Sequence, residues 1–127
     1  MRIAMAQINA TVGDLEGNAA TISEYIGNAK KNGVDLVVFP ELAITGYPPQ
    51  DLLLENAFVK RNKKLLEELI SHNRDVAGVI GFVDYKEKNL YNAAAVFNGN
   101  RLIGVIYKAL LPTYDVFDED RYFKPAK

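Results

Sequence analysis

The chain has 127 residues, of which 49% are hydrophobic and 24% charged, proportions that are ordinary for one folded domain or part of one. Its 15 lysines and arginines nearly balance its 16 aspartates and glutamates, so the net charge is −1. That balance argues against nucleic acid or an anionic membrane surface as a partner. The chain contains no cysteine and one histidine, which excludes a disulfide, a thiolate nucleophile and the usual zinc sites within it.

No apolar run is long enough to span a membrane, and the N-terminus lacks the apolar stretch and cleavage site of a signal peptide. A cytoplasmic location is therefore expected. Residues 2–8 alternate in character and predict a short buried strand carrying Ile3 and Met5. Apolar residues then recur at helical spacing over 18–32, with Asn18 as the expected N-cap.

Residues 34–39 are almost continuously apolar, which predicts a strand covered on both faces. Together with the preceding strand and helix they predict a right-handed βαβ unit. A proline-rich loop is expected over 40–49, and a second amphipathic helix over 57–71. The fold class that these elements indicate is α/β.

Three further strands are predicted over residues 76–85, 90–97 and 101–107. The Asn98-Gly99-Asn100 turn between the last two is typical of a hairpin. The remaining residues are irregular and rich in aromatic side chains, which need a surface to pack against. Because the preceding elements offer no obvious one, the domain is expected to be cut short. The aromatic side chains concerned are Tyr114, Phe117, Tyr122 and Phe123.

Two charged residues follow buried strands and are the candidates for chemistry. Glu41 comes directly after Phe39 and Pro40, at the carboxyl end of a predicted strand, where ligands bind in open α/β folds. A carboxylate held there and partly desolvated suits a general base. Lys108 stands at the end of another apolar run. At such a position an ammonium group can pair with a carboxylate and stabilise an oxyanion. Taken singly, each residue is more often a solvated strand-end charge.

The sequences around both residues resemble those of a known family. Residues 39–42 (Phe-Pro-Glu-Leu) with Thr45-Gly46-Tyr47 resemble the glutamate motif of the nitrilase superfamily of amidases, and Tyr107-Lys108 with Leu111-Pro112 resembles its lysine motif. The resemblance covers essentially the whole chain. It implies an α-β-β-α sandwich, of which residues 1–127 form about the first half. Residues 45–53 and 114–123 are similar to the glutaminase domains of the glutamine-dependent NAD⁺ synthetase family.

The resemblance implies roles for four residues. Glu41 is expected to act as the general base and Lys108 to stabilise the tetrahedral intermediate. Tyr114 is expected to line a glutamine pocket, and Tyr47 to shape its entrance. The nucleophile is expected to be a cysteine on a later strand, outside these 127 residues, so the chain alone is predicted to be inactive. Glutamine is the implied substrate, and the implied parent enzyme is a homo-oligomer.

No cofactor is expected in this chain; ATP and Mg²⁺ are implied only for a separate synthetase domain. His72 is interpreted as a surface residue at a helix end. The acidic group at 115 and 118–120 matches no calcium loop, and its members are expected to be solvated or paired with Arg121. Two alternatives remain: an amidase of the same superfamily with another substrate, and a truncated interaction module without catalytic activity.

Overall fold

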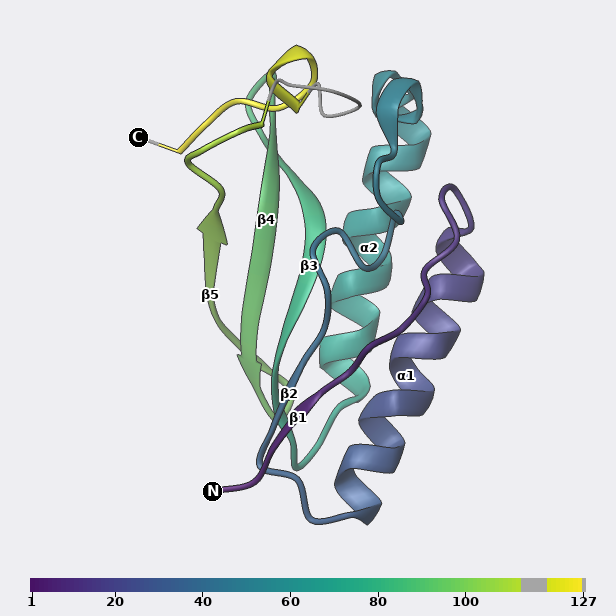
Figure 1. The fold of residues 1–127 in the computed structure, drawn as a ribbon, viewed down its shortest axis with the longest axis vertical. Helices are drawn as coiled ribbons and strands as arrows, with labels where there is room; N and C mark the ends of the chain where they lie inside the picture. The colour runs from purple at the N-terminus through teal and green to yellow at the C-terminus, as the bar shows by residue number, and fades with distance from the viewer. Residues whose placement is uncertain (113–118, 127) are drawn as a thin grey trace.

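A computed structural model describes residues 1–112 and 119–126. Five strands form one mixed sheet in the order β1-β2-β3-β4-β5 (Figure 1). The elements, in chain order, are β1 (Ile3–Met5), α1 (Leu15–Lys31), β2 (Leu36–Val38), the 3₁₀ helix η1 (Gln50–Leu54), α2 (Asn56–His72), β3 (Ala77–Lys86), β4 (Asn89–Asn98), β5 (Arg101–Tyr107) and the 3₁₀ helix η2 (Glu119–Arg121).

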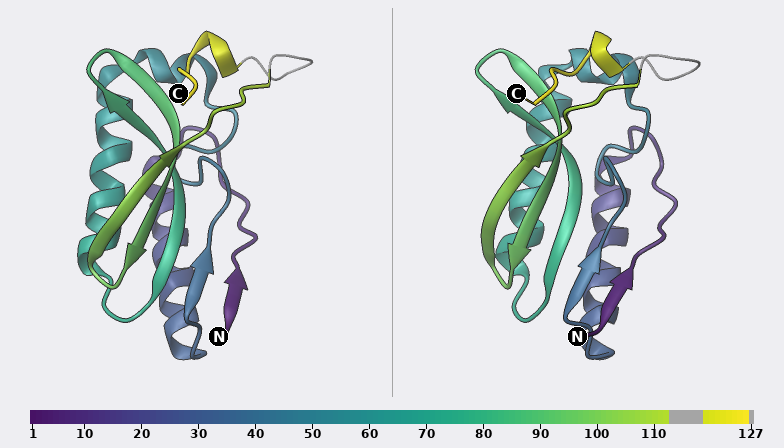
Figure 2. Two further views of the ribbon diagram at one scale, coloured as in Figure 1. Left: turned by 90° about the vertical axis from the view of Figure 1, so that its left-hand side faces the viewer. Right: turned by 60° about the vertical axis from the view of Figure 1, so that its left-hand side comes forward.

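The sheet changes from parallel to antiparallel at β3. β1, β2 and β3 run parallel, with Met5 paired to Val38 and Val38 to Val79. The β3–β4 and β4–β5 pairs are antiparallel hairpins, and the second of them was predicted from the Asn98-Gly99-Asn100 turn. Figure 2 shows that the antiparallel strands are much longer than β1 and β2.

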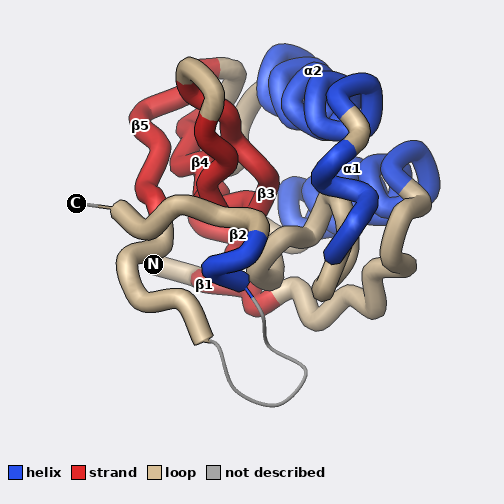
Figure 3. The backbone as a smooth tube through the Cα atoms, turned by 90° about the horizontal axis from the view of Figure 1, so that it is seen from above, coloured by secondary structure: helices blue, strands red, loops and turns tan. Residues whose placement is uncertain are grey.

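The two helices cover a single face of the sheet, as Figure 3 shows from above. The core lies between them, and Ile22 of α1, Leu66 of α2 and Phe82 of β3 are almost fully buried in it. The other face is open. Ile3 and Met5 are 56% and 69% exposed, so the prediction that they are buried was wrong. Side chains alternate along a strand, and Ala4 and Ala6 are the residues of this segment that face the helices.

β2 is also shorter than predicted and is not covered on both faces: Val37 is buried, but its neighbours in the strand are only half-buried. The start of α1 was predicted wrongly as well. Asp14 is the N-cap, and its carboxylate accepts a hydrogen bond from the Gly17 amide at 3.1 Å. Asn18 lies inside the helix and is buried. Its side-chain amide donates to the Ile44 carbonyl oxygen at 2.9 Å and thereby ties the helix to the loop after β2.

A second apolar cluster lies at the end of the sheet where the chain carries Glu41 and Lys108. It contains Leu42, Leu53, Val59, Val83 and Phe123, all buried. Phe123 therefore does have a packing surface, contrary to expectation. The sequence could not indicate it because the cluster joins loop, helix and strand residues from distant parts of the chain. Among the described residues, no helix is long and apolar enough to cross a membrane.

Candidate active site

Glu41 is placed by the turn that follows β2. The Phe39 amide still donates to Val79 of β3 at 2.9 Å, and the chain then turns across that strand. Gly81 makes the crossing possible. A Cβ atom at position 81 would stand 2.5 Å from the Pro40 oxygen and 2.9 Å from the Glu41 carbonyl carbon. Only glycine therefore permits Glu41 to lie this close to the sheet.

Lys108 and Asn92 reach the same place from the antiparallel half of the sheet. Lys108 directly follows β5, and its amide donates to the Asn92 carbonyl oxygen of β4 at 2.8 Å. The Lys108 carbonyl oxygen accepts a hydrogen bond from the Ala126 amide at 3.0 Å. The backbone amide and carbonyl groups of Lys108 are thus both hydrogen-bonded, independently of the contacts that its side chain makes.

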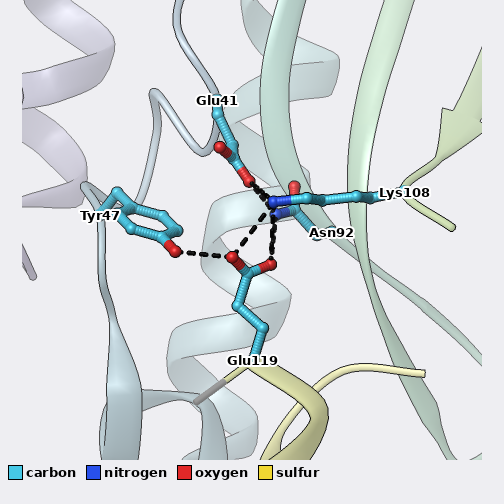
Figure 4. Close-up of polar contacts among 5 residues, drawn as sticks. All are labelled: Glu41, Tyr47, Asn92, Lys108 and Glu119. Atoms are coloured by element: carbon cyan, nitrogen blue, oxygen red, sulfur yellow. Dashed lines mark hydrogen bonds and ion pairs between the residues drawn. The ribbon is translucent and has the colours of Figure 1, made fainter. Parts of the chain in front are cut away.

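The side chains of Glu41, Lys108, Asn92, Glu119 and Tyr47 form one hydrogen-bonded cluster (Figure 4). Lys108 Nζ lies 2.6 Å from Glu41 Oε1 and 3.1 Å from Glu119 Oε2. Asn92 Nδ2 donates to Glu41 Oε1 at 2.6 Å and to Glu119 Oε1 at 3.2 Å. The predicted pair of Glu41 and Lys108 is therefore in direct contact, but it belongs to a larger network.

Glu119 is the main site residue that the sequence did not predict. It was expected to be solvated or paired with Arg121, and this was wrong: it is only 5% exposed. Tyr47 donates its hydroxyl to Glu119 Oε2 at 2.6 Å, so Tyr47 lies in the cluster, adjacent to the predicted pair. A buried carboxylate requires such partners, because removal from water is costly. The only available signal was that Glu119 lies in the stretch similar to the synthetase family.

The two carboxylates keep Lys108 charged. Partial burial lowers the pKa of Lys108, but its hydrogen bonds to Glu41 and Glu119 and their negative charges raise the pKa by more, so the net pKa is above its ordinary value. At neutral pH the group is an ammonium ion that donates hydrogen bonds, and it does not act as a base. Within the cluster, the groups that could accept a proton at neutral pH are therefore the carboxylates.

Glu41 is the carboxylate that remains accessible. Its side chain is 44% exposed, and within the described residues its Oε2 atom accepts no hydrogen bond, since both contacts use Oε1. A groove of about 240 Å³ adjoins it. Small and apolar residues such as Gly81, Ala94 and Ile106 line the groove beside Glu41 and Lys108. The arrangement offers a proton acceptor and a fixed cation at one edge of an apolar surface, which suits acyl-group chemistry.

Other predicted residues contribute less. Tyr114 lies outside the described residues, as do two of the acidic residues, Asp115 and Asp118. His72 is exposed at the end of α2, and its Nδ1 atom lies 2.7 Å from the Glu68 carbonyl oxygen, as expected for a helix-end residue. Within residues 1–112 and 119–126 no group of three histidine or acidic side chains could hold a metal ion.

Comparison with known proteins identifies the family of the chain. The profile of the carbon-nitrogen hydrolase family matches residues 2–127. The chain therefore belongs to the carbon-nitrogen hydrolase family.

Its sequence is similar to that of the glutamine-dependent NAD⁺ synthetase of Thermotoga maritima, with 45% identity over 129 positions. The match covers the whole chain but 22% of that relative. The solved structure of the glutamine-dependent NAD⁺ synthetase of Acinetobacter baumannii superposes with a TM-score of 0.93 at 40% identity, covering 98% of the chain and 24% of that protein. An amidase of Nesterenkonia, 23% identical with a TM-score of 0.85, shares the fold over 48% of its own length.

Proposed function

We propose that this chain provides the glutamate and lysine of the glutamine-hydrolysing site of an NAD⁺ synthetase. The observation that carries the proposal is the contact between Lys108 and Glu41 at 2.6 Å at the edge of a groove that both residues line, with the second Glu41 oxygen accepting no hydrogen bond among the described residues. The similarity to glutamine-dependent NAD⁺ synthetases over the full chain supports the choice of glutamine over other amides. Because the chain spans about a fifth of those relatives, the remaining activity resides in sequence outside it.

In the proposed reaction, Glu41 accepts the thiol proton of a cysteine supplied by a later strand, and the thiolate attacks the glutamine amide carbon. Lys108 stabilises the oxyanion of the tetrahedral intermediate with its fixed positive charge. Collapse of that intermediate releases ammonia and leaves a thioester, which water then hydrolyses to glutamate. The family resemblance supports two further roles: Tyr47 would shape the entrance of the glutamine pocket, and Tyr114, which lies outside the described residues, would line it.

The ammonia is then used by a separate domain that amidates nicotinic acid adenine dinucleotide. The proposal assigns ATP and Mg²⁺ to that domain because of the similarity to glutamine-dependent NAD⁺ synthetases. The proposal also places the enzyme in the cytoplasm as a homo-oligomer without a nucleic-acid or membrane partner. The near balance of charge supports the part that concerns nucleic acid and membranes, because positive charge is not in excess.

A hybrid enzyme tests the proposal directly. In it, this chain replaces the segment that it matches in the Thermotoga maritima synthetase, and NAD⁺ formation is measured with glutamine and, separately, with ammonium chloride. We expect activity with both. Glu41→Gln and Lys108→Met should abolish the glutamine-dependent reaction and leave the ammonium-dependent reaction intact, since ammonium bypasses the hydrolytic site.

The ammonium reaction is the internal control for folding of the hybrid. A hybrid that uses ammonium but not glutamine would contradict the proposal, and so would an unaffected glutamine reaction in either variant. The isolated chain gives a second test. It contains no cysteine, so we expect no release of ammonia from glutamine above the buffer rate.

A further inference from the structure

A second polar cluster lies on the other side of the sheet from Glu41. It includes Tyr107, the residue that precedes Lys108 in the sequence. The Tyr107 hydroxyl donates a hydrogen bond to Asp84 Oδ2 on β3 at 2.6 Å. Asp84 is only 6% exposed, and its other oxygen lies 2.8 Å from Lys63 Nζ of α2. The Tyr107 ring stacks on Tyr91 of β4, with ring centroids 4.1 Å apart and planes 9° from parallel. Tyr107 thus contacts residues of β3 and β4, and its partner Asp84 is paired with a lysine of α2.

Stability alone does not account for this cluster. Burying a charged carboxylate costs several kcal/mol in solvation, and a buried ion pair is about as stable as, or less stable than, apolar residues of the same size. Tyr107 already packs against the main core through its ring. What the hydroxyl and Asp84 add is a fixed position for the ring, because a charge-assisted hydrogen bond is short and directional.

That position matters because of strand alternation. Tyr107 is the last residue of β5 and Lys108 follows it, so their side chains point to opposite sides of the sheet. Tyr107 points toward α2 and the core, and Lys108 toward Glu41 and Glu119. A rotation or slip of the strand end that moved the Tyr107 ring would move the lysine ammonium by a similar amount.

We propose that Asp84 and Tyr107 are positioning residues for Lys108, fixing the end of β5 so that the ammonium group stays between Glu41 and Glu119. Neither residue contacts the substrate in this scheme. The inference rests on the proposed function only for its effect on activity, since the effect on the position of Lys108 can be measured without any reaction.

The decisive variant is Tyr107→Phe, which keeps the ring and removes the hydroxyl. Tyr91→Phe is the matched control: it is the same change on the stacked partner, whose hydroxyl makes no hydrogen bond among the described residues. In the hybrid enzyme we expect Tyr107→Phe to lower kcat with glutamine about tenfold, with KM changed less than twofold, because small displacements of a reacting group are costly. Ammonium-dependent synthesis should be unchanged in both variants.

Asp84 variants separate positioning from a general loss of structure. Asp84→Asn keeps an acceptor for the Tyr107 hydroxyl and should retain most of the glutamine activity, whereas Asp84→Leu should behave as Tyr107→Phe does. Hydrogen exchange at the Lys108 amide provides a readout without turnover. It should be about tenfold faster in Tyr107→Phe and unchanged in Tyr91→Phe.

Equal effects of Tyr107→Phe and Tyr91→Phe on exchange and on kcat would overturn the inference, as would full activity in Asp84→Leu. If the parent hybrid is inactive with glutamine, the proposed function fails, and amide exchange alone decides this inference. If the parent hybrid is active and Tyr107→Phe matches it, only the positioning role is refuted.

Discussion

Gly81 of β3 lies directly against the backbone of Glu41, so close that a methyl group at position 81 would stand 2.9 Å from the Glu41 carbonyl carbon. The Glu41 carboxylate is therefore positioned by the absence of a side chain on a neighbouring strand. Leu42, the next residue, has a positive φ of 49° and is completely buried, which anchors the turn on its other side. The site thus depends on a close backbone approach that few substitutions permit.

Substitution of Gly81 by alanine should displace this turn. We expect Gly81→Ala to lower the free energy of unfolding by about 1–3 kcal/mol, as overpacking does, and to impair glutamine-dependent activity in the hybrid enzyme. Gly104→Ala is the control, since a Cβ atom there would meet no atom within 4 Å. Urea unfolding of both variants checks the prediction, and equal stability of the two would refute it.

Neutralising Glu119 should weaken the contacts that fix the position of the Lys108 ammonium group. Glu119→Gln keeps the shape but removes the charge that Lys108 and Tyr47 contact. Hydrogen bonds to charged groups contribute about 1.5–3 kcal/mol, so we expect glutamine turnover in the hybrid to fall about 10- to 100-fold. The pKa of Lys108 should fall as well, because one of the groups that raise it is lost. Glu24→Gln, on the exposed side of α1, should change neither quantity.

Asn92 separates two carboxylates, and a third negative charge in its place should be poorly tolerated. In Asn92→Asp, the introduced carboxylate would face Glu41 and Glu119 in a site where the amide is 4% exposed. We expect a loss of about 3 kcal/mol at pH 7, as for an unpaired buried charge.

The loss of stability in Asn92→Asp should depend on pH, because the pKa of the introduced carboxyl group is shifted upward. Repulsion raises the folded-state pKa of the introduced carboxyl above its unfolded value of about 3.9. The folded state then retains a proton that the unfolded state has released, so the deficit appears above about pH 4 and grows with pH. Urea unfolding of Asn92→Asp and wild type between pH 4 and 7 should show the gap widening. The exposed Asn98→Asp should show a constant, small difference, and a pH-independent gap for Asn92→Asp would contradict the prediction.

The Tyr107 hydroxyl should lose its proton at a higher pH than an ordinary tyrosine does. Burial, the hydrogen bond to Asp84 and the charge of Asp84 raise the pKa of Tyr107 to about 12, with a smaller contribution from Tyr91; Lys63 is the cation paired with the same carboxylate. The unfolded chain loses this proton near pH 10, so the stabilisation is complete below pH 10 and is lost as the pH rises toward 12. NMR of the tyrosine rings should show the shift, and Asp84→Asn should lower it. A midpoint near 10 in the wild type would contradict the prediction.

The order of the helices and strands could be predicted from local sequence patterns, and so could the two residues that belong to local motifs. Apolar periodicity located α2 within one residue at each end, and the Asn98-Gly99-Asn100 turn located the hairpin between β4 and β5. Glu41 and Lys108 could be predicted because each directly follows an apolar strand, and because their neighbours match a family pattern. These are local signals, and they are available before any folding occurs.

The side chains that complete the site could be identified only after the distant segments of the chain were placed in three dimensions. Glu119 looks like one acid among several in an acidic loop, and its burial depends on contacts with Lys108, Asn92 and Tyr47 from three distant segments. The same holds for the single covered face of the sheet, which left Ile3 and Met5 exposed against expectation. Burial is a property of what the rest of the chain brings near a residue, and periodicity alone does not specify it.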